Sequence, residues 1–130
     1  MKNGAKKILI VDDDKFLLDM YSVKFTEAGF EVDTAFGATE ALEKLARGFS
    51  PSALLLDIVM PEMSGLELLG KIYNQKLAPN AAIIVLSNQG QPGDIEEAKK
   101  IGVDGYIIKA STIPSEVLDQ VEDIIKRKNA

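Results

Sequence analysis

Short apolar runs alternate with longer amphipathic stretches along the chain, and this alternation restricts the fold more than any other feature. The runs predict strands at residues 8–11, 31–35, 53–56, 81–86 and 106–108. Apolar residues at helical spacing predict helices at 15–28, 38–47, 66–75 and 94–102, and a terminal helix carrying Val117, Leu118, Val121, Ile124 and Ile125. Because strands that are apolar on both faces must be covered on both sides, the pattern predicts a parallel sheet between helical layers. Right-handed crossovers make a doubly wound, three-layer (αβα) α/β fold with five strands and five helices the simplest arrangement.

Residues that favour helix ends support these boundaries. Gly29 and Gly48 follow two of the helical stretches and predict where they stop. Asp94 and Thr112 are expected to cap the fourth and fifth helices, and Pro114 is tolerated in the first turn of the last one. The 130 residues contain no repeat, linker or low-complexity segment, so we expect a single domain over residues 1–130.

Composition excludes several classes of chemistry. The chain has no cysteine and no histidine, which removes disulfides, thiolate or imidazole metal ligands and Ser-His-Asp triads. Its net charge is −5 and it has no long basic run, so direct binding to nucleic acid is not expected. No apolar run approaches the roughly 18 residues that span a bilayer. We therefore expect a cytoplasmic protein with no membrane partner.

Polar side chains follow four of the five predicted strands. They are Asp12, Asp13 and Asp14 after the first strand, Asp57 after the third, Ser87 after the fourth and Lys109 after the fifth. In an open α/β sheet, ligands bind beyond the carboxyl ends of the strands, so we expect these groups at one site. Taken singly, each also has a structural explanation, and Asp14 in particular is suited to cap a helix.

The clustered carboxylates predict a divalent cation. Two like charges about 4 Å apart cost roughly 4 kcal/mol at an effective dielectric near 20, which no structural role would explain. In a chain without His or Cys, hard oxygen ligands favour Mg²⁺ or a similar ion such as Mn²⁺. A cation beside a free carboxylate suits transfer of a phosphoryl group to Asp57, giving an acyl phosphate. Lys109 and the hydroxyl of Ser87 would then neutralise phosphoryl oxygens.

Four motifs resemble the receiver domain of response regulators in bacterial two-component systems, including chemotaxis receivers. They occupy residues 8–14, 54–65, 83–87 and 102–109, and the likeness extends over nearly the whole chain, from Lys7 to Lys126. The second motif, LLLDIVMPEMSG, is the most specific. The resemblance implies a flavodoxin-like sheet with strand order 2-1-3-4-5. It also implies one receiver domain, and we expect no output domain within these 130 residues.

The resemblance implies a role for each site residue. Asp57 would accept the phosphoryl group from a histidine kinase or a histidine phosphotransfer protein. Asp13, Asp57 and the backbone carbonyl of Val59 would bind Mg²⁺ directly, whereas Asp12 would act mostly through a coordinated water. Ser87 corresponds to the switch hydroxyl, Lys109 to the phosphate-binding lysine and Tyr106 to the switch aromatic. The helix after Asp94, the last strand and the terminal helix would form the face that binds a downstream protein.

Three positions depart from the family pattern. Ala110 stands where the family usually has proline, so the peptide bond after Lys109 is expected to be either trans or strained. Asn88 stands where a small residue is usual, and we expect the phosphate to be lost more slowly than in an Asn88→Ala variant. Ser52 stands where an acidic residue is common, and we expect no consequence from this change.

Three other functions compete with a phosphorylated switch. A receiver-like interaction module that is not phosphorylated would generally lack one of the acidic, hydroxyl or lysine groups, and none is missing here. An aspartyl-phosphate hydrolase of the haloacid dehalogenase type usually has a second Asp two residues after the nucleophile, where this chain has Val59. A flavin-binding domain would need a phosphate-binding loop after the first strand, where this chain has three aspartates. The sequence therefore favours a reversible phosphoacceptor over a turnover enzyme.

Overall fold

Five strands alternate with five helices in the computed structural model, which describes residues 6–87, 92–109 and 112–128. The elements are β1 (Lys7–Val11), α1 (Lys15–Glu27), β2 (Glu31–Ala35), α2 (Ala38–Ala46), β3 (Ala53–Leu56), α3 (Gly65–Asn74), β4 (Ala82–Ser87), α4 (Pro92–Ile101), β5 (Gly105–Ile108) and α5 (Pro114–Lys128). Within the described residues, no helix combines the length and the apolar character needed to cross a membrane.

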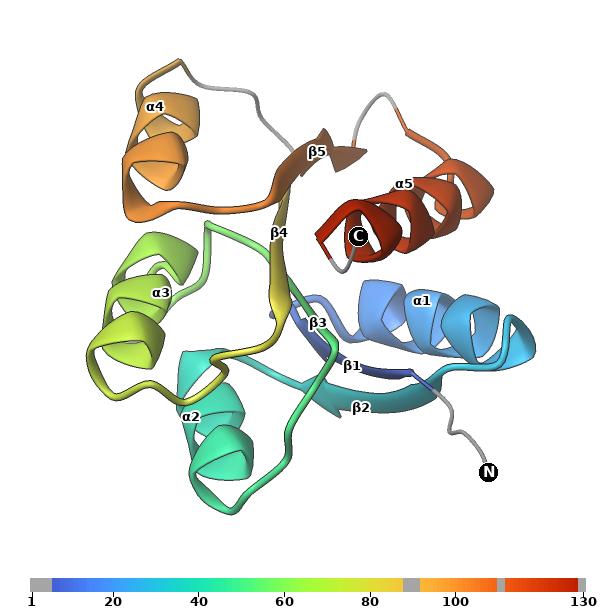
Figure 1. The fold of residues 1–130 in the computed structure, drawn as a ribbon, viewed down its shortest axis with the longest axis horizontal. Coiled ribbons are helices and arrows are strands. Elements are labelled where there is room, and N and C mark those ends of the chain that lie inside the picture. Colours follow the sequence, from blue (N-terminus) through green and yellow to red (C-terminus); the bar gives the residue numbers. More distant parts are fainter. Residues whose placement is uncertain (1–5, 88–91, 110–111, 129–130) are drawn as a thin grey trace.

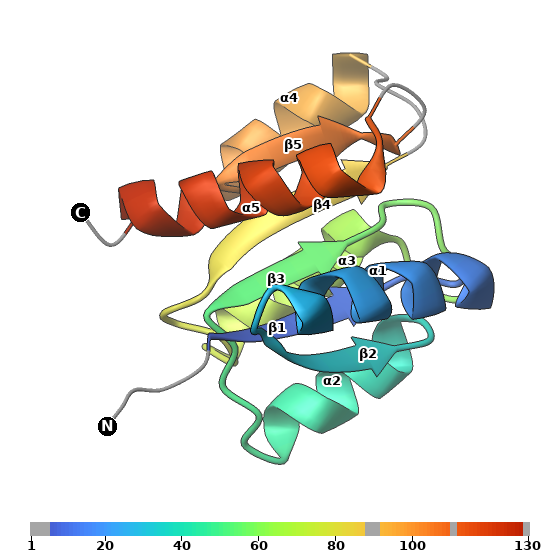
Figure 2. The same ribbon diagram turned by 90° about the vertical axis from the view of Figure 1, so that its right-hand side faces the viewer.

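The strands form one parallel sheet in the order β2-β1-β3-β4-β5. Helices α2, α3 and α4 cover one face of this sheet, and α1 and α5 cover the other (Figures 1 and 2). The predicted three-layer arrangement and the strand order implied by the resemblance are both confirmed. All the strands run in one direction, so their carboxyl ends meet at one edge of the sheet, on the right in Figure 2.

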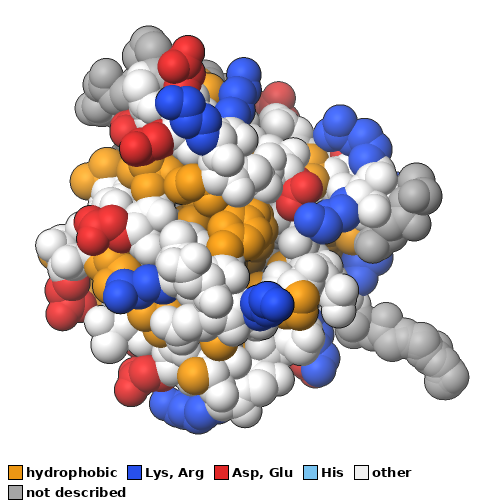
Figure 3. All heavy atoms as spheres, turned by 60° about the vertical axis from the view of Figure 1, so that its left-hand side comes forward, with side chains coloured by type: hydrophobic (Ala, Val, Ile, Leu, Met, Phe, Trp, Pro, Cys, Tyr) orange, Lys and Arg blue, Asp and Glu red, His pale blue; other side chains and the backbone are white. Residues whose placement is uncertain are grey.

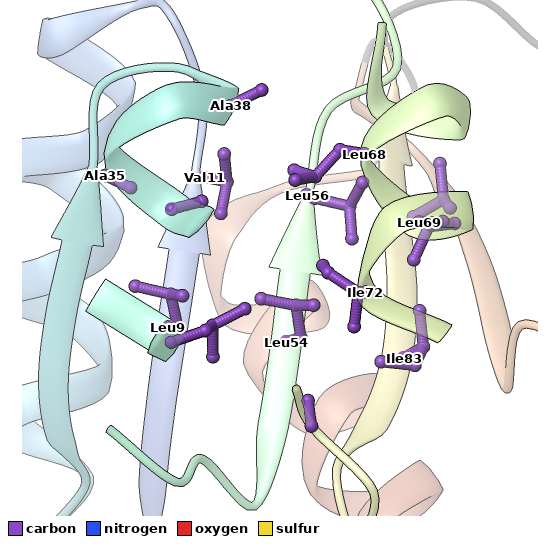
Figure 4. Packing of buried hydrophobic residues seen from close by; sticks show 14 of the residues in the cluster. Leu9, Val11, Ala35, Ala38, Leu54, Leu56, Leu68, Leu69, Ile72 and Ile83 are labelled. Carbon is purple, nitrogen blue, oxygen red and sulfur yellow. The ribbon is translucent and has the colours of Figure 1, made fainter. Parts of the chain in front are cut away.

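Alternate residues of each strand supply the two halves of the core. On one face, Leu9 and Val11 of β1 and Leu54 and Leu56 of β3 pack against α2 and α3 (Figure 4). The intervening residues, such as Ile10, pack against α1 and α5 on the other face. This is the result expected when a central strand is buried on both sides, and it explains why β1 and β3 read as continuous apolar runs.

The predicted caps of the last two helices are both misplaced. Helix α4 begins at Pro92, so Asp94 lies in its first turn rather than at its cap. Helix α5 begins at Pro114, and Ile113 rather than Thr112 precedes it. Proline suits the first position of a helix because its ring presets φ and because the missing N–H has no partner in the helix there. At the other end of the chain, Asp14 does cap α1, since its side chain accepts a hydrogen bond from the backbone N–H of Leu17.

Asp104 fastens β5 to β4 at the amino end of the sheet. Its backbone N–H donates to the carbonyl of Ile83 at 2.7 Å, and its carboxylate accepts from the N–H of Ile83 at 2.8 Å. The same carboxylate lies 2.9 Å from the ammonium of Lys128 near the end of α5. One side chain therefore joins two strands and a helix before the chain enters β5.

Candidate functional site

The predicted polar residues come together at the carboxyl edge of the sheet. They line a cavity of about 760 Å³. Its polar lining includes Asp12, Asp13, Asp57, Ser87 and Lys109. Asp12 follows β1, Asp57 follows β3 and Lys109 follows β5, whereas Ser87 is the last residue of β4. The doubly wound topology is what brings these groups together, because they lie up to 97 residues apart in the sequence.

Three carboxylates form a cluster that suits a hard cation. One oxygen from each of Asp12, Asp13 and Asp57 lies within 4.8 Å of the others. Asp12 and Asp57 are 3% and 6% exposed, so water screens their repulsion poorly. Lys109 supplies one positive charge against three carboxylates, which leaves negative charge for a cation to balance. The donor set therefore fits Mg²⁺, which prefers carboxylate oxygens and retains several waters.

Lys109 is held more closely by Asp12 than by Asp57. Its ammonium lies 2.6 Å from Asp12 Oδ2 and 3.4 Å from Asp57 Oδ2. Burial by itself lowers the pKa of Lys109, but the hydrogen bond and charge of Asp12, with a smaller effect of Asp57, raise the pKa above its ordinary value. The lysine is therefore a fixed cation between two buried carboxylates.

The Asp57 carboxyl is placed by its backbone and made less acidic by burial. Its N–H donates to the carbonyl of Val11 at 3.0 Å, and its Oδ1 accepts from the N–H of Val59 at 3.4 Å. Burial raises the pKa of Asp57 above its usual range, Lys109 opposes this shift, and the charge of Asp12 adds to it. A cation beside these carboxylates would favour the ionised form that can act as a nucleophile.

Ser87 and Tyr106 lie next to each other on neighbouring strands. Ser87 is 3% exposed, and its side chain is hydrogen-bonded to that of Tyr106. Burial raises the pKa of Tyr106, and the hydrogen bond with Ser87 partly opposes that rise. The phenol is partly buried against the core on the side of α2, α3 and α4. The structure thus connects the cavity, through Ser87, with the face that carries α4 and β5.

Gly65 is a site residue that the sequence analysis did not single out. It is the first residue of α3, and its N–H donates to the carbonyl of Ile58 at 2.7 Å. A Cβ built on Gly65 would collide with the carbonyl oxygen of Asp57 and would lie 2.9 Å from Ile58 Cα. Only glycine lets α3 start this close to the backbone of Asp57. Ser64 caps the helix and Glu67 follows three residues later, a capping-box signal that was present in the sequence.

Apolar side chains surround the mouth of the cavity. Phe16, Phe36 and Val59 all line it and are 75%, 55% and 69% exposed. Phe36 directly follows β2, the strand that contributes no polar group. Sequence reasoning named Val59 only for its backbone carbonyl, and it missed Phe16 and Phe36 because an exposed aromatic in a helical or loop pattern looks like a core residue until the fold is known.

The three departures from the family pattern lie in different places. Asn88 and Ala110, with the predictions attached to them, lie outside the described residues. Ser52 is at the amino end of β3, where its N–H donates to the carbonyl of Lys7 at 2.7 Å. That position is at the opposite edge of the sheet from the cavity.

Comparison with known proteins gives a consistent set of relatives. A family model described as the response regulator receiver domain matches residues 8–122. The chemotaxis protein CheY of Thermotoga maritima is 38% identical over 123 residues, covering 94% of this chain and 99% of that protein. A CheY-like receiver domain protein from Methanospirillum hungatei aligns with a TM-score of 0.88 at 32% identity, covering 97% of this chain and 98% of that one. The response regulator TrrA of Thermotoga maritima, solved in complex with Mg²⁺-BeF, aligns with a TM-score of 0.78 at 33% identity, covering 92% and 98% of the two chains.

Proposed function

This chain belongs to the family of response regulator receiver domains, the phosphorylation-dependent switches of two-component systems, and we propose that Asp57 is its phosphoacceptor. The observation that carries the proposal is the position of the Asp57 carboxyl, which is 6% exposed in a cavity shared with two other carboxylates and Lys109. We propose that residues 1–130 act as one receiver domain in the cytoplasm, without direct contact with nucleic acid or a membrane.

The reaction is a phosphoryl transfer from a phosphohistidine. A carboxylate oxygen of Asp57 attacks phosphorus, the P–N bond breaks, and its electron pair stays on the imidazole nitrogen, which takes up a proton. The ammonium of Lys109, which lies 3.4 Å from Asp57 Oδ2, pairs with one phosphoryl oxygen, and this new contact weakens its ion pair with Asp12. The hydroxyl of Ser87 donates to a second phosphoryl oxygen. Later attack by water on phosphorus restores the carboxylate, so the chain is a phosphoacceptor rather than an enzyme with a separate substrate.

Mg²⁺, or Mn²⁺ in its place, is the cofactor that the cluster would hold. Asp13, Asp57 and the backbone carbonyl of Val59 would be ligands, and Asp12 would act mostly through a bound water. Such an ion neutralises charge on the transferred phosphoryl group. The support for this assignment is the set of three carboxylate oxygens within 4.8 Å of one another in a chain that has no His or Cys.

The switch follows from the contact between Ser87 and Tyr106. When the Ser87 hydroxyl turns toward a phosphoryl oxygen, its hydrogen bond with Tyr106 must change, because a hydroxyl has only one proton to donate. Tyr106 then repacks, and the population of α4, β5 and α5 arrangements shifts. We propose that this α4-β5-α5 face binds the downstream protein.

The phosphodonor would dock at the mouth of the cavity. Phe16, Phe36 and Val59 present exposed apolar surface there, around the carboxylates. Large exposed apolar side chains gathered at one place are typical of a protein-binding surface. A histidine kinase or histidine phosphotransfer protein would cover this rim and bring its phosphohistidine over Asp57.

Intact-mass measurement after incubation with acetyl phosphate and Mg²⁺ tests the proposal. We expect one phosphoryl group to be added, with no addition to Asp57→Asn and none after chelation of the metal. Asp119→Asn is the matched control, because Asp119 is an exposed carboxylate on α5 that does not line the cavity, and it should be phosphorylated normally. Failure of the natural protein to gain mass would favour an interaction module that is not phosphorylated, and equal addition to Asp57→Asn would place the phosphoacceptor elsewhere.

A further inference from the structure

A second cavity lies between α3 and α4, away from the carboxylate cluster. This α3–α4 groove has a volume of about 440 Å³, and its apolar lining comes from Ile58, Leu66 and Ile101. Figure 3, which brings the face with α3 and α4 forward, shows an exposed apolar band between the upper and middle parts of the molecule. Several acidic side chains lie to the left of this band, on the side of the carboxyl edge of the sheet, and basic side chains lie above it. The groove therefore has an apolar floor beside a charged rim.

The rim of the α3–α4 groove carries only negative charge. Glu67, Asp94 and Glu97 line the groove, and no Lys or Arg appears in its lining as far as the structure describes the chain. Across residues 6–87, 92–109 and 112–128, none of these three carboxylates forms an ion pair with a basic side chain. An apolar floor flanked by unpaired carboxylates is complementary to apolar side chains flanked by Lys or Arg.

A hydrogen bond between the two helical segments fixes their spacing at one end of the groove. The hydroxyl of Tyr73, in the last turn of α3, donates to the carbonyl of Gly102 just after α4 at 3.0 Å. A preformed groove reduces the ordering cost of binding. The lining follows α4 from Asp94 to Ile101, about 10 Å along the helix axis, and includes the first turn of α3, so the groove is long enough for about two turns of a docked helix.

We propose that the α3–α4 groove binds a basic amphipathic helix of a partner protein. Apolar side chains at i, i+4 and i+7 would occupy the floor formed by Ile58, Leu66 and Ile101, and flanking Lys or Arg would face Glu67, Asp94 and Glu97. A helix suits the groove better than an extended strand because the walls are helices whose backbone groups are already paired. The net charge of −5 adds long-range attraction for a basic partner.

Binding of a defined peptide tests the proposal without any phosphorylation, so the result does not depend on the role of Asp57. The probe is a fluorescein-labelled helical peptide of about 14 residues with leucines at the i, i+4 and i+7 spacing and lysines beside them. We expect binding by fluorescence anisotropy, with amide chemical-shift changes in ¹⁵N spectra confined to α3, α4 and the segment after Asp57. Peptides with serine in place of leucine, or glutamate in place of lysine, should lose binding.

Charge reversal at the rim distinguishes binding in the groove from general electrostatic attraction of the peptide to an acidic protein. Glu97→Lys should raise the Kd roughly fivefold, since it replaces an attraction at the rim with a repulsion. Glu43→Lys is the matched control, because Glu43 is exposed on α2, lines none of these walls and changes the net charge equally. Equal weakening by both variants, shifts mapping to another face, or no binding at millimolar peptide would overturn the proposal. A dimer of this chain that Glu97→Lys dissociates would assign the groove to a second copy instead, and would also overturn it.

Discussion

Replacing Gly65 with alanine should destabilise the protein, although alanine is the better helix former. The added Cβ collides with the backbone carbonyl of Asp57 and lies 2.9 Å from Ile58 Cα. Both neighbours are backbone atoms, so no side-chain rotation relieves the collision. The start of α3 must move away from the strand, and this movement stretches the 2.7 Å hydrogen bond from the Gly65 N–H to the Ile58 carbonyl.

The expected loss follows from these contacts. Overpacking a tight site costs about 1–3 kcal/mol, and weakening the hydrogen bond adds about 0.5–1.5 kcal/mol. The higher helix propensity of alanine offsets up to about 1 kcal/mol of this loss in a helix interior, and less at the first helical position, which Gly65 occupies. We therefore expect Gly65→Ala to lower the free energy of unfolding by about 2 kcal/mol. It should also slow phosphorylation by acetyl phosphate, because it shifts the backbone of Asp57.

Gly70 provides a control within the same helix. A Cβ at Gly70 meets nothing within 4 Å, so Gly70→Ala should stabilise the protein by about 0.5–1 kcal/mol through helix propensity alone. Urea unfolding followed by far-UV circular dichroism measures both variants, and the chain has no Trp to serve as a fluorescent probe. The reasoning is refuted if Gly65→Ala unfolds at the same urea concentration as the natural protein, or if the two variants change stability in the same direction.

Two further predictions concern buried and half-buried lysines. Lys109→Met should lower stability by about 3 kcal/mol in the absence of metal, because it leaves Asp12 and Asp57 buried without their cation. Thermal unfolding should show Mg²⁺ stabilising this variant more than the natural protein, and equal stabilisation would contradict the account. The side chain of Lys44 is 24% exposed, and its ammonium lies 2.6 Å from Asp33 Oδ1. Burial lowers the pKa of Lys44, but Asp33 and Glu40 raise it by more, so the pKa is above its ordinary value. Relative to Lys44→Met, the charged lysine should add about 0.5–1 kcal/mol to the free energy of unfolding. This stabilisation should be complete below about pH 10 and shrink as the pH rises through the raised pKa. A stabilisation that grows at alkaline pH would refute this.

Most of the fold was predictable because its strands are buried on both faces. The apolar runs in β1 and β3 mark those strands within one residue, and the glycines after α1 and α2 mark the ends of those helices. The start of α4 was placed two residues late and the cap of α5 one residue early, because a capping side chain was given more weight than a proline at the first helical position. The start of α3 was also placed one residue late, since glycine is a poor helix former and only the approach to Asp57 explains its presence there.

The polar residues of the site were predictable from topology alone. Parallel strands deliver Asp12, Asp57, Ser87 and Lys109 to one edge whatever the details of packing. The partner of Lys109 was not predictable, because the difference between 2.6 Å to Asp12 and 3.4 Å to Asp57 depends on side-chain positions. The apolar rim of Phe16 and Phe36 was missed for a related reason, since exposure is a property of the folded surface and leaves no local pattern in the sequence.

The attachment of Asp104 determines what kind of motion β5 can make. Because backbone and carboxylate hydrogen bonds join Asp104 to Ile83, and Lys128 holds the same carboxylate, the amino end of β5 is a fixed point. A strand fixed at one end pivots rather than slides, so displacement grows with distance along it. Tyr106 lies two residues from that point and Lys109 five, so the largest movement falls beside the carboxylates and the smallest at the far edge of the sheet. Asp104 would thus act as a pivot for β5, with the larger displacement at its carboxyl end, beside the proposed phosphorylation site.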